Sequence, residues 1–200
     1  MTNTVEKTNT RDRLLAVAAE LFSVHGYQAV GVRDIAKLLG INAGSIYNHV
    51  DSKQTLLYEL VDETLCNLIS RTQRSINSKS SALSRLHKFI EIFFDFNKAF
   101  PGQMLVVSRE EYNLNTEQKA GVSARYADYM MLLENILRGI IPQYSNQGVS
   151  RLARTILAFM FGQLFLKELA LSNSSLSQFI TRLVWIEGSR HHATPVAPPQ

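Results

Sequence analysis

The sequence predicts an all-α protein, and three observations carry that prediction. Apolar residues recur at three- and four-residue spacing along most of the 200 residues, which is the period of one face of an α-helix. No run between turns alternates Val, Ile or Thr with polar residues, as half-buried strands do. The breaks between periodic segments are rich in Gly, Pro, Asn and Ser, which favour loops.

The N-terminal region predicts one longer helix followed by two short ones. Asn9 or Thr10 can cap the first helix, and Gly26 can end it in the left-handed conformation. A second helix is expected to end at Gly40, and Asn42 can cap a third over residues 43–49. The apolar residues that define the first two helices are Leu14, Leu15, Ala18 and Phe22, then Val32, Ile35, Ala36 and Leu39.

A long fourth helix should begin after Asp51 or Ser52. The polar stretch 77–81 then separates this head from the rest of the chain. Further helices are expected at about 81–98, 102–111, 116–141, 150–171 and 175–189. Three of the five prolines lie beyond Gly188, so residues 190–200 are expected to be a disordered tail.

Composition excludes several classes of protein. Apolar residues make up 46% and charged residues 19%, as in folded globular domains. The single cysteine, Cys66, excludes an internal disulfide framework. The longest apolar run, 155–166, is well short of the ~20 residues of a membrane helix, and residues 1–10 lack the apolar core of a secretion signal. We therefore expect a cytoplasmic protein that does not enter a membrane.

The net charge of +4 gives no support for a nucleic-acid-binding head. The first 60 residues hold six basic and six acidic side chains, so the excess of positive charge lies in the remainder. Any DNA-binding role of the head must therefore rest on pattern.

The second and third helices, joined through Gly40, have the arrangement of a helix-turn-helix. On a helix, Ala43 and Val50 lie on the same side as Ile46, and we expect this side to be buried. The opposite side carries small or hydrogen-bonding groups that suit the DNA major groove, although a solvent-facing Asn is the commoner explanation for a residue such as Asn48. These outward residues are Gly44, Ser45, Tyr47 and Asn48.

Several spaced pieces in fixed order resemble the DNA-binding head of TetR/AcrR-type transcriptional regulators. All of these pieces lie between Arg11 and Leu57. In chain order they are AELF (19–22), HGY (25–27), VRDIA (32–36), GINAGSIYNH (40–49), SK (52–53) and LL (56–57). The sequence departs from the family's usual residues at Gly31, Ala43 and Val50.

The resemblance implies a homodimer on a double-stranded DNA operator, with a DNA-binding domain at 1–56 and a ligand-binding and dimerisation domain at 57–189. Carried over to matching positions, Tyr47, His49 and Lys53 would hold phosphates. The residues at or near the bases would be Arg33, Gly44, Ser45 and Asn48. Taken alone, each of these residues has a simpler explanation in packing, capping or exposure to solvent.

The C-terminal body is rich in aromatic residues, with five phenylalanines between positions 89 and 100. They could line an apolar ligand site or form an ordinary hydrophobic core. Residues 107–139 weakly resemble TetR-type regulators of fatty-acid or sterol breakdown, which suggests an acyl-CoA as one effector. Arg109 or Arg125 could pair with the charged groups of such a ligand. The same arginines could instead pair with neighbouring carboxylates. The candidate ligand-binding residues are Phe89, Phe93, Phe96, Met104, Arg109, Tyr112, Arg125, Tyr126, Tyr129 and Phe161.

The last two helices carry apolar surface that suits a four-helix dimer interface, although the core of a monomer could use it in the same way. No nucleophile elbow, phosphate loop or metal-ligand spacing appears, so no catalytic residue, metal or cofactor is expected. The main hypothesis is a ligand-responsive transcriptional repressor that an apolar small molecule releases from a palindromic operator. The alternative is a helical carrier of hydrophobic small molecules that does not bind DNA.

Overall fold

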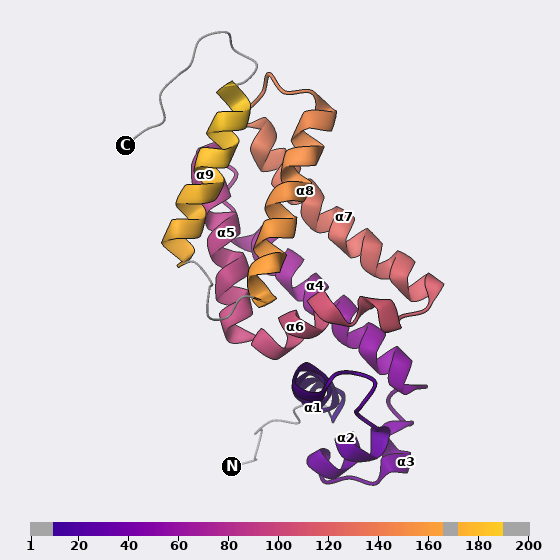
Figure 1. Cartoon of the computed structure of the whole chain (residues 1–200). Helices are drawn as coiled ribbons and strands as arrows, with labels where there is room; N and C mark the ends of the chain where they lie inside the picture. Colours follow the sequence, from indigo (N-terminus) through magenta and orange to yellow (C-terminus); the bar gives the residue numbers. More distant parts are fainter. Residues whose placement is uncertain (1–9, 166–171, 190–200) are drawn as a thin grey trace, which may run out of the picture. The chain divides into compact units, whose positions relative to one another are not determined.

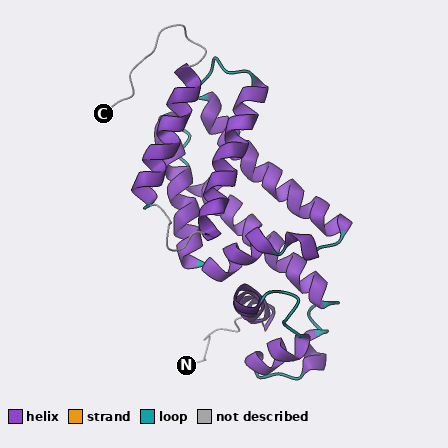
Figure 2. Cartoon of the chain, in the orientation of Figure 1, coloured by secondary structure: helices purple, strands orange, loops and turns teal. Residues whose placement is uncertain are grey.

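The computed structural model describes residues 10–165 and 172–189, and these residues form helices and loops without a strand (Figures 1 and 2). The all-α prediction is thus confirmed. The predicted tail, 190–200, and the end of the helix predicted at 150–171 lie outside the described residues. The elements are α1 (Thr10–His25), α2 (Val32–Leu39), α3 (Ala43–Ile46), α4 (Lys53–Ser75), α5 (Ala82–Ala99), α6 (Pro101–Arg109), η1 (Glu111–Asn113), α7 (Thr116–Arg138), α8 (Asn146–Gly162), η2 (Gln163–Phe165) and α9 (Asn173–Ser189).

The chain divides into two compact units. Unit 1 comprises residues 1–65 and 100–123, and unit 2 comprises residues 66–99 and 124–200. Unit 1 therefore contains the predicted DNA-binding head together with α6, η1 and the start of α7, which the sequence assigned to the body.

The helix ends of unit 1 follow the predicted signals. Gly26 and Gly40 both have a positive φ, of 81° and 71°, so each ends its helix in the left-handed conformation. The Asn42 side chain accepts a hydrogen bond from Gly44 N at 3.2 Å and caps α3. Ser52 caps α4 by accepting from Thr55 N at 2.9 Å.

Helix α3 is shorter than the predicted segment 43–49, and that prediction was wrong by three residues. It ends at Ile46, and the chain continues in turns. The N–H groups of Asn48 and His49 bond to the carbonyls three residues earlier, Ser45 and Ile46, rather than four. The change to this tighter pattern is common in a last helical turn.

Helix α6 packs closely on α1 inside unit 1. The reason is visible at Gly102, where a Cβ would lie 3.1 Å from Ser23 Oγ and 3.5 Å from the Ala19 carbonyl oxygen. Only a residue without a side chain allows this approach at no cost. On another side of α1, Arg11 forms ion pairs with Glu59 at 2.7 Å and Glu63 at 3.1 Å of α4.

Unit 2 is built from the second part of α4 with α5, most of α7, α8 and α9. Helices α5 and α9 lie side by side (Figure 1), and the His87 ring and the Thr181 hydroxyl bond across them at 3.1 Å. The core of this unit contains the fully buried rings of Phe89, Phe93 and Tyr129.

We expect Gly40→Ala to lower the free energy of unfolding by about 1–2 kcal/mol, because φ at Gly40 is positive and a Cβ is strained there. The matched control is Gly162→Ala, since a Cβ would meet nothing within 4 Å at either site but Gly162 is helical. The control should raise stability by up to ~1 kcal/mol. Urea unfolding of both variants is the measurement, and equal effects would contradict the role of φ.

Candidate functional site

The exposed side of α3 and the turn after it is the first candidate site. Ile46 and Val50 are buried as predicted for the inner side of this segment, whereas Ala43, predicted to share that side, is half-buried. Gly44, Asn48 and His49 are exposed, and Ser45 is half-buried. The ring of Tyr47 is 55% exposed, which is unusual for a large aromatic side chain without a partner molecule.

Two cationic side chains predicted to meet DNA differ in their surroundings. Arg33 is exposed in the first turn of α2. The Lys53 ammonium donates hydrogen bonds to the carbonyls of Tyr27, at 3.0 Å, and Val30, at 2.8 Å. It also lies 4.2 Å from the centre of the Tyr27 ring, and its partial burial lowers its pKa. Lys53 therefore fixes the loop between α1 and α2, and its phosphate contact stays a prediction.

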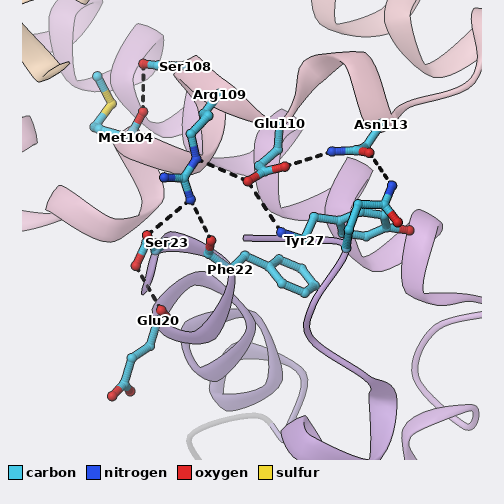
Figure 3. Close-up of polar contacts among 10 residues, drawn as sticks. Glu20, Phe22, Ser23, Tyr27, Met104, Ser108, Arg109, Glu110 and Asn113 are labelled. Atoms are coloured by element: carbon cyan, nitrogen blue, oxygen red, sulfur yellow. Dashed lines mark hydrogen bonds and ion pairs between the residues drawn. The ribbon is translucent and has the colours of Figure 1, made fainter. Parts of the chain in front are cut away.

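A second set of contacts joins the end of α6 to the end of α1 (Figure 3). Arg109 Nη2 donates to the carbonyls of Phe22, at 3.0 Å, and Ser23, at 3.2 Å. These carbonyls belong to the last turn of α1, where a cation is favoured because the helix dipole is negative. Arg109 Nε also pairs with Glu110 Oε1 at 3.2 Å. The structure thus shows the carboxylate pairing that the sequence left open, and ligand binding by Arg109 stays a prediction.

Glu110 is the centre of this arrangement; its pairing with Arg109 was one of the alternatives from the sequence, whereas its contact with the loop after α1 was not predicted. Its side chain is only 3% exposed, and Oε1 accepts the N–H of Tyr27 at 3.4 Å. Oε2 accepts from Asn113 Nδ2 at 2.7 Å, while Asn113 Oδ1 accepts from Gln28 Nε2 at 2.6 Å. We call Arg109, Glu110, Asn113 and Gln28 the polar cluster. The contacts with Tyr27 and Gln28 span more than 80 residues of the chain, so no local pattern could have predicted them.

The predicted ligand-binding residues divide between the two units. Met104, Arg109 and Tyr112 belong to unit 1, and Tyr112 is 71% exposed. In unit 2, Phe96 lies 5.5 Å from the Arg71 guanidinium, and Arg125 pairs with Asp128 at 3.9 Å. The remaining candidates come together and are called the ring cluster: Phe89, Phe93, Tyr126, Tyr129 and Phe161.

The ring cluster joins α5, α7 and α8 within unit 2. Phe89 stacks on Tyr129 with centroids 4.7 Å apart. Phe93 meets Phe161 edge to face at 5.0 Å, and Phe161 meets Tyr126 at 5.6 Å. Such contacts supply apolar surface of the kind that surrounds hydrophobic ligands, and they equally stabilise a core.

Residues 10–165 and 172–189 contain no group of three or more His, Cys, Asp or Glu side chains that could hold a metal ion. Over the same residues, none of the helices has both the length and the apolar character required to cross a membrane.

The geometry defines a class of protein: helix-turn-helix proteins, in which a short helix exposes small and hydrogen-bonding groups beside a buried apolar side. Residues 14–60 match the family model described as bacterial regulatory proteins, tetR family. Over these residues the chain is similar to the members of that family.

Individual relatives are similar over different lengths. The HTH-type transcriptional repressor KstR2 of Mycolicibacterium smegmatis is 31% identical over 110 residues, which are 55% of this chain and 54% of that protein. This chain thus spans about half the length of that relative. The fatty acid metabolism regulator protein of Bacillus subtilis is 26% identical over 180 residues, 84% of this chain and 93% of its own.

A solved structure supports the fold along most of the chain. It is that of the transcriptional regulator FadR from Bacillus subtilis in complex with stearoyl-CoA, with a TM-score of 0.73 and 21% identity. The match covers 86% of this chain and 96% of that chain. At this identity the likeness concerns the fold alone.

We expect Glu110→Ala to lower the free energy of unfolding by about 2 kcal/mol, because it leaves the Tyr27 N–H and the Arg109 and Asn113 side chains short of an acceptor. The control is Glu20→Ala, the same change at an exposed position of α1, which should cost less than ~0.5 kcal/mol. Urea unfolding followed by circular dichroism measures both. Equal losses would show that the polar cluster contributes nothing specific.

Proposed function

We propose that this protein is a ligand-responsive transcriptional repressor that binds a palindromic DNA operator and is released from it by an apolar small molecule. The observation that carries the proposal is the exposed side of α3 with Tyr47 held in solvent. A regulator of this kind acts on DNA in the cytoplasm and needs no catalytic residue.

The proposed DNA interface uses the outward residues in two ways. Tyr47 and His49 would contact phosphates, whereas Gly44, Ser45, Asn48 and Arg33 would lie at or near base edges. The even charge of the head means that few phosphates are neutralised, so the salt dependence of binding should be shallow. The relatives named as transcriptional regulators support this function, and they do not favour the carrier hypothesis.

A homodimer would present two copies of α3 to successive major grooves, about 34–36 Å apart. Surface for such a dimer is available on the last two helices of unit 2. Phe179 of α9 is 46% exposed and lies 5.0 Å from the ring of Phe159 on α8, and Ile186 is exposed further along α9. Apolar side chains exposed together mark surfaces for association.

The proposed effector class is an acyl-CoA thioester. The ring cluster would supply apolar surface for the acyl chain, as aromatic walls do in hydrophobic ligand sites. The FadR relative was solved with stearoyl-CoA, which supports this class for the present chain.

Selection of a random DNA duplex pool with the purified protein tests DNA binding and yields the operator. We expect a palindrome to be enriched, and Tyr47→Phe, which removes one hydroxyl from an exposed ring, to bind it about tenfold more weakly. Tyr112→Phe makes the same change on another exposed ring and should bind normally. If folded protein enriches no sequence, the carrier hypothesis is favoured instead.

Gly44→Ala separates contact with DNA from folding. A Cβ at Gly44 would lie 3.9 Å from Asn42 Oδ1, so it fits the free protein, and alanine should stabilise the short helix by up to ~1 kcal/mol. If α3 meets the bases at Gly44, the added methyl group should weaken operator binding about tenfold or more. A variant that is more stable and binds the operator as well as wild type would contradict the proposed approach. Fluorescence anisotropy with the selected operator and thermal unfolding are the two measurements.

A further prediction concerns the effector. Stearoyl-CoA, used as the probe, should weaken operator binding by about 5–150-fold, the usual range of coupling between two sites. The measurement is a titration of the protein–operator complex at fixed salt, with free coenzyme A as the control. An operator affinity that is unchanged although stearoyl-CoA binds the protein would contradict the proposed coupling.

A further inference from the structure

The Tyr129 hydroxyl is buried in unit 2 without a hydrogen bond. The side chain of Tyr129, on α7, has no exposed surface, and Oη has no hydrogen-bond partner. Burial raises the pKa of Tyr129 far above its ordinary value, so the group stays a neutral O–H donor. A buried donor without an acceptor destabilises a fold, and phenylalanine in its place would fill nearly the same volume without that penalty.

The hydroxyl of Thr72 acts on the Tyr129 hydroxyl without meeting the geometry of a hydrogen bond to it. Thr72 lies on α4 and is fully buried. Its interaction with the Tyr129 hydroxyl opposes the effect of burial on the pKa of Tyr129. The hydrogen of Thr72 is committed to the Leu68 carbonyl at 2.8 Å. Thr72 therefore cannot donate to Tyr129, and its oxygen is the protein acceptor with which an effector oxygen would compete for the Tyr129 hydrogen.

The surroundings of Tyr129 are aromatic. Its ring stacks on Phe89, which shares one face of α5 with Phe93 one turn later. Tyr126 precedes Tyr129 by three residues on the same side of α7 and meets Phe161 of α8. The Tyr129 hydroxyl is thus a buried hydrogen-bond donor among mainly apolar rings. A ligand oxygen placed against these rings would be recognised by its direction as well as its shape.

We propose that the effector carries a hydrogen-bond-accepting oxygen, a carbonyl or a hydroxyl, within its apolar part, and that the Tyr129 hydroxyl donates to it. This inference rests on the proposed function, because it takes the ring cluster as the place of the acyl chain. It narrows the effector class from acyl-CoA thioesters in general to those with an oxygenated chain. Sites that hydrogen-bond a substrate group discriminate strongly against the analogue that lacks it.

Binding of matched ligands tests the proposal. The probes are hexadecanoyl-CoA and a series of hexadecanoyl-CoA derivatives, each with a single oxo group at a different chain position, titrated by calorimetry. At least one oxo derivative should bind wild type about tenfold or more tighter than the plain chain. Tyr129→Phe should reduce that preference to less than about threefold and keep the affinity for the plain chain. Tyr58→Phe, outside the ring cluster, is the control and should keep the preference.

The melting temperature without ligand is an independent measurement. Tyr129→Phe should melt at the wild-type temperature or above it, because the hydroxyl it removes has no partner. A clear drop would mean that the hydroxyl is already bonded, to Thr72 or to a buried water, and would overturn the proposal.

The outcomes separate this proposal from the proposed function. Equal affinity of wild type for plain and oxo chains would overturn the role of Tyr129 and leave the acyl-CoA class standing. If no probe binds, the effector class is wrong, and this proposal fails with it. DNA binding is tested separately by the operator selection.

Discussion

The buried carboxylate of Glu110 is the constraint on which the geometry of unit 1 depends. A carboxylate taken out of water is costly unless its oxygens are bonded, and here the Tyr27 N–H, Arg109 and Asn113 supply the donors. Because Tyr27 belongs to the loop that leads into α2, the same bonds fix where the helix-turn-helix begins. Arg109 meanwhile neutralises the exposed carbonyls at the end of α1.

Unit 1 is therefore larger than the helix-turn-helix that the sequence displays. The loop between α1 and α2 is held from one side by Lys53 of α4 and from the other by the end of α6. A change in the position of α6 would act directly on the contacts of Tyr27 and Gln28. The polar cluster thus connects the helix-turn-helix physically to residues that the sequence assigns to the body.

Unit 2 depends on a different kind of interaction. Its interior is held by aromatic contacts, which bury large apolar areas. Such an interior can adapt to apolar chains of different shape, whereas a single hydroxyl can distinguish among them only if it has no partner in the protein. The two units therefore differ in kind: unit 1 depends on directional polar contacts and unit 2 on packed aromatic surface.

The sequence by itself determined the helices, the turns at Gly26 and Gly40, the Asn42 cap and the buried side of α3, because each depends on residues within a few positions of one another. It placed the end of α3 three residues too late, because the tighter turn after Ile46 leaves no periodic signal. Only the tertiary structure decided the partners of Lys53, Arg109 and Glu110, and which aromatic residues meet. Most of those contacts join residues far apart in the chain, and charge or aromatic character alone does not say which partner a side chain will reach.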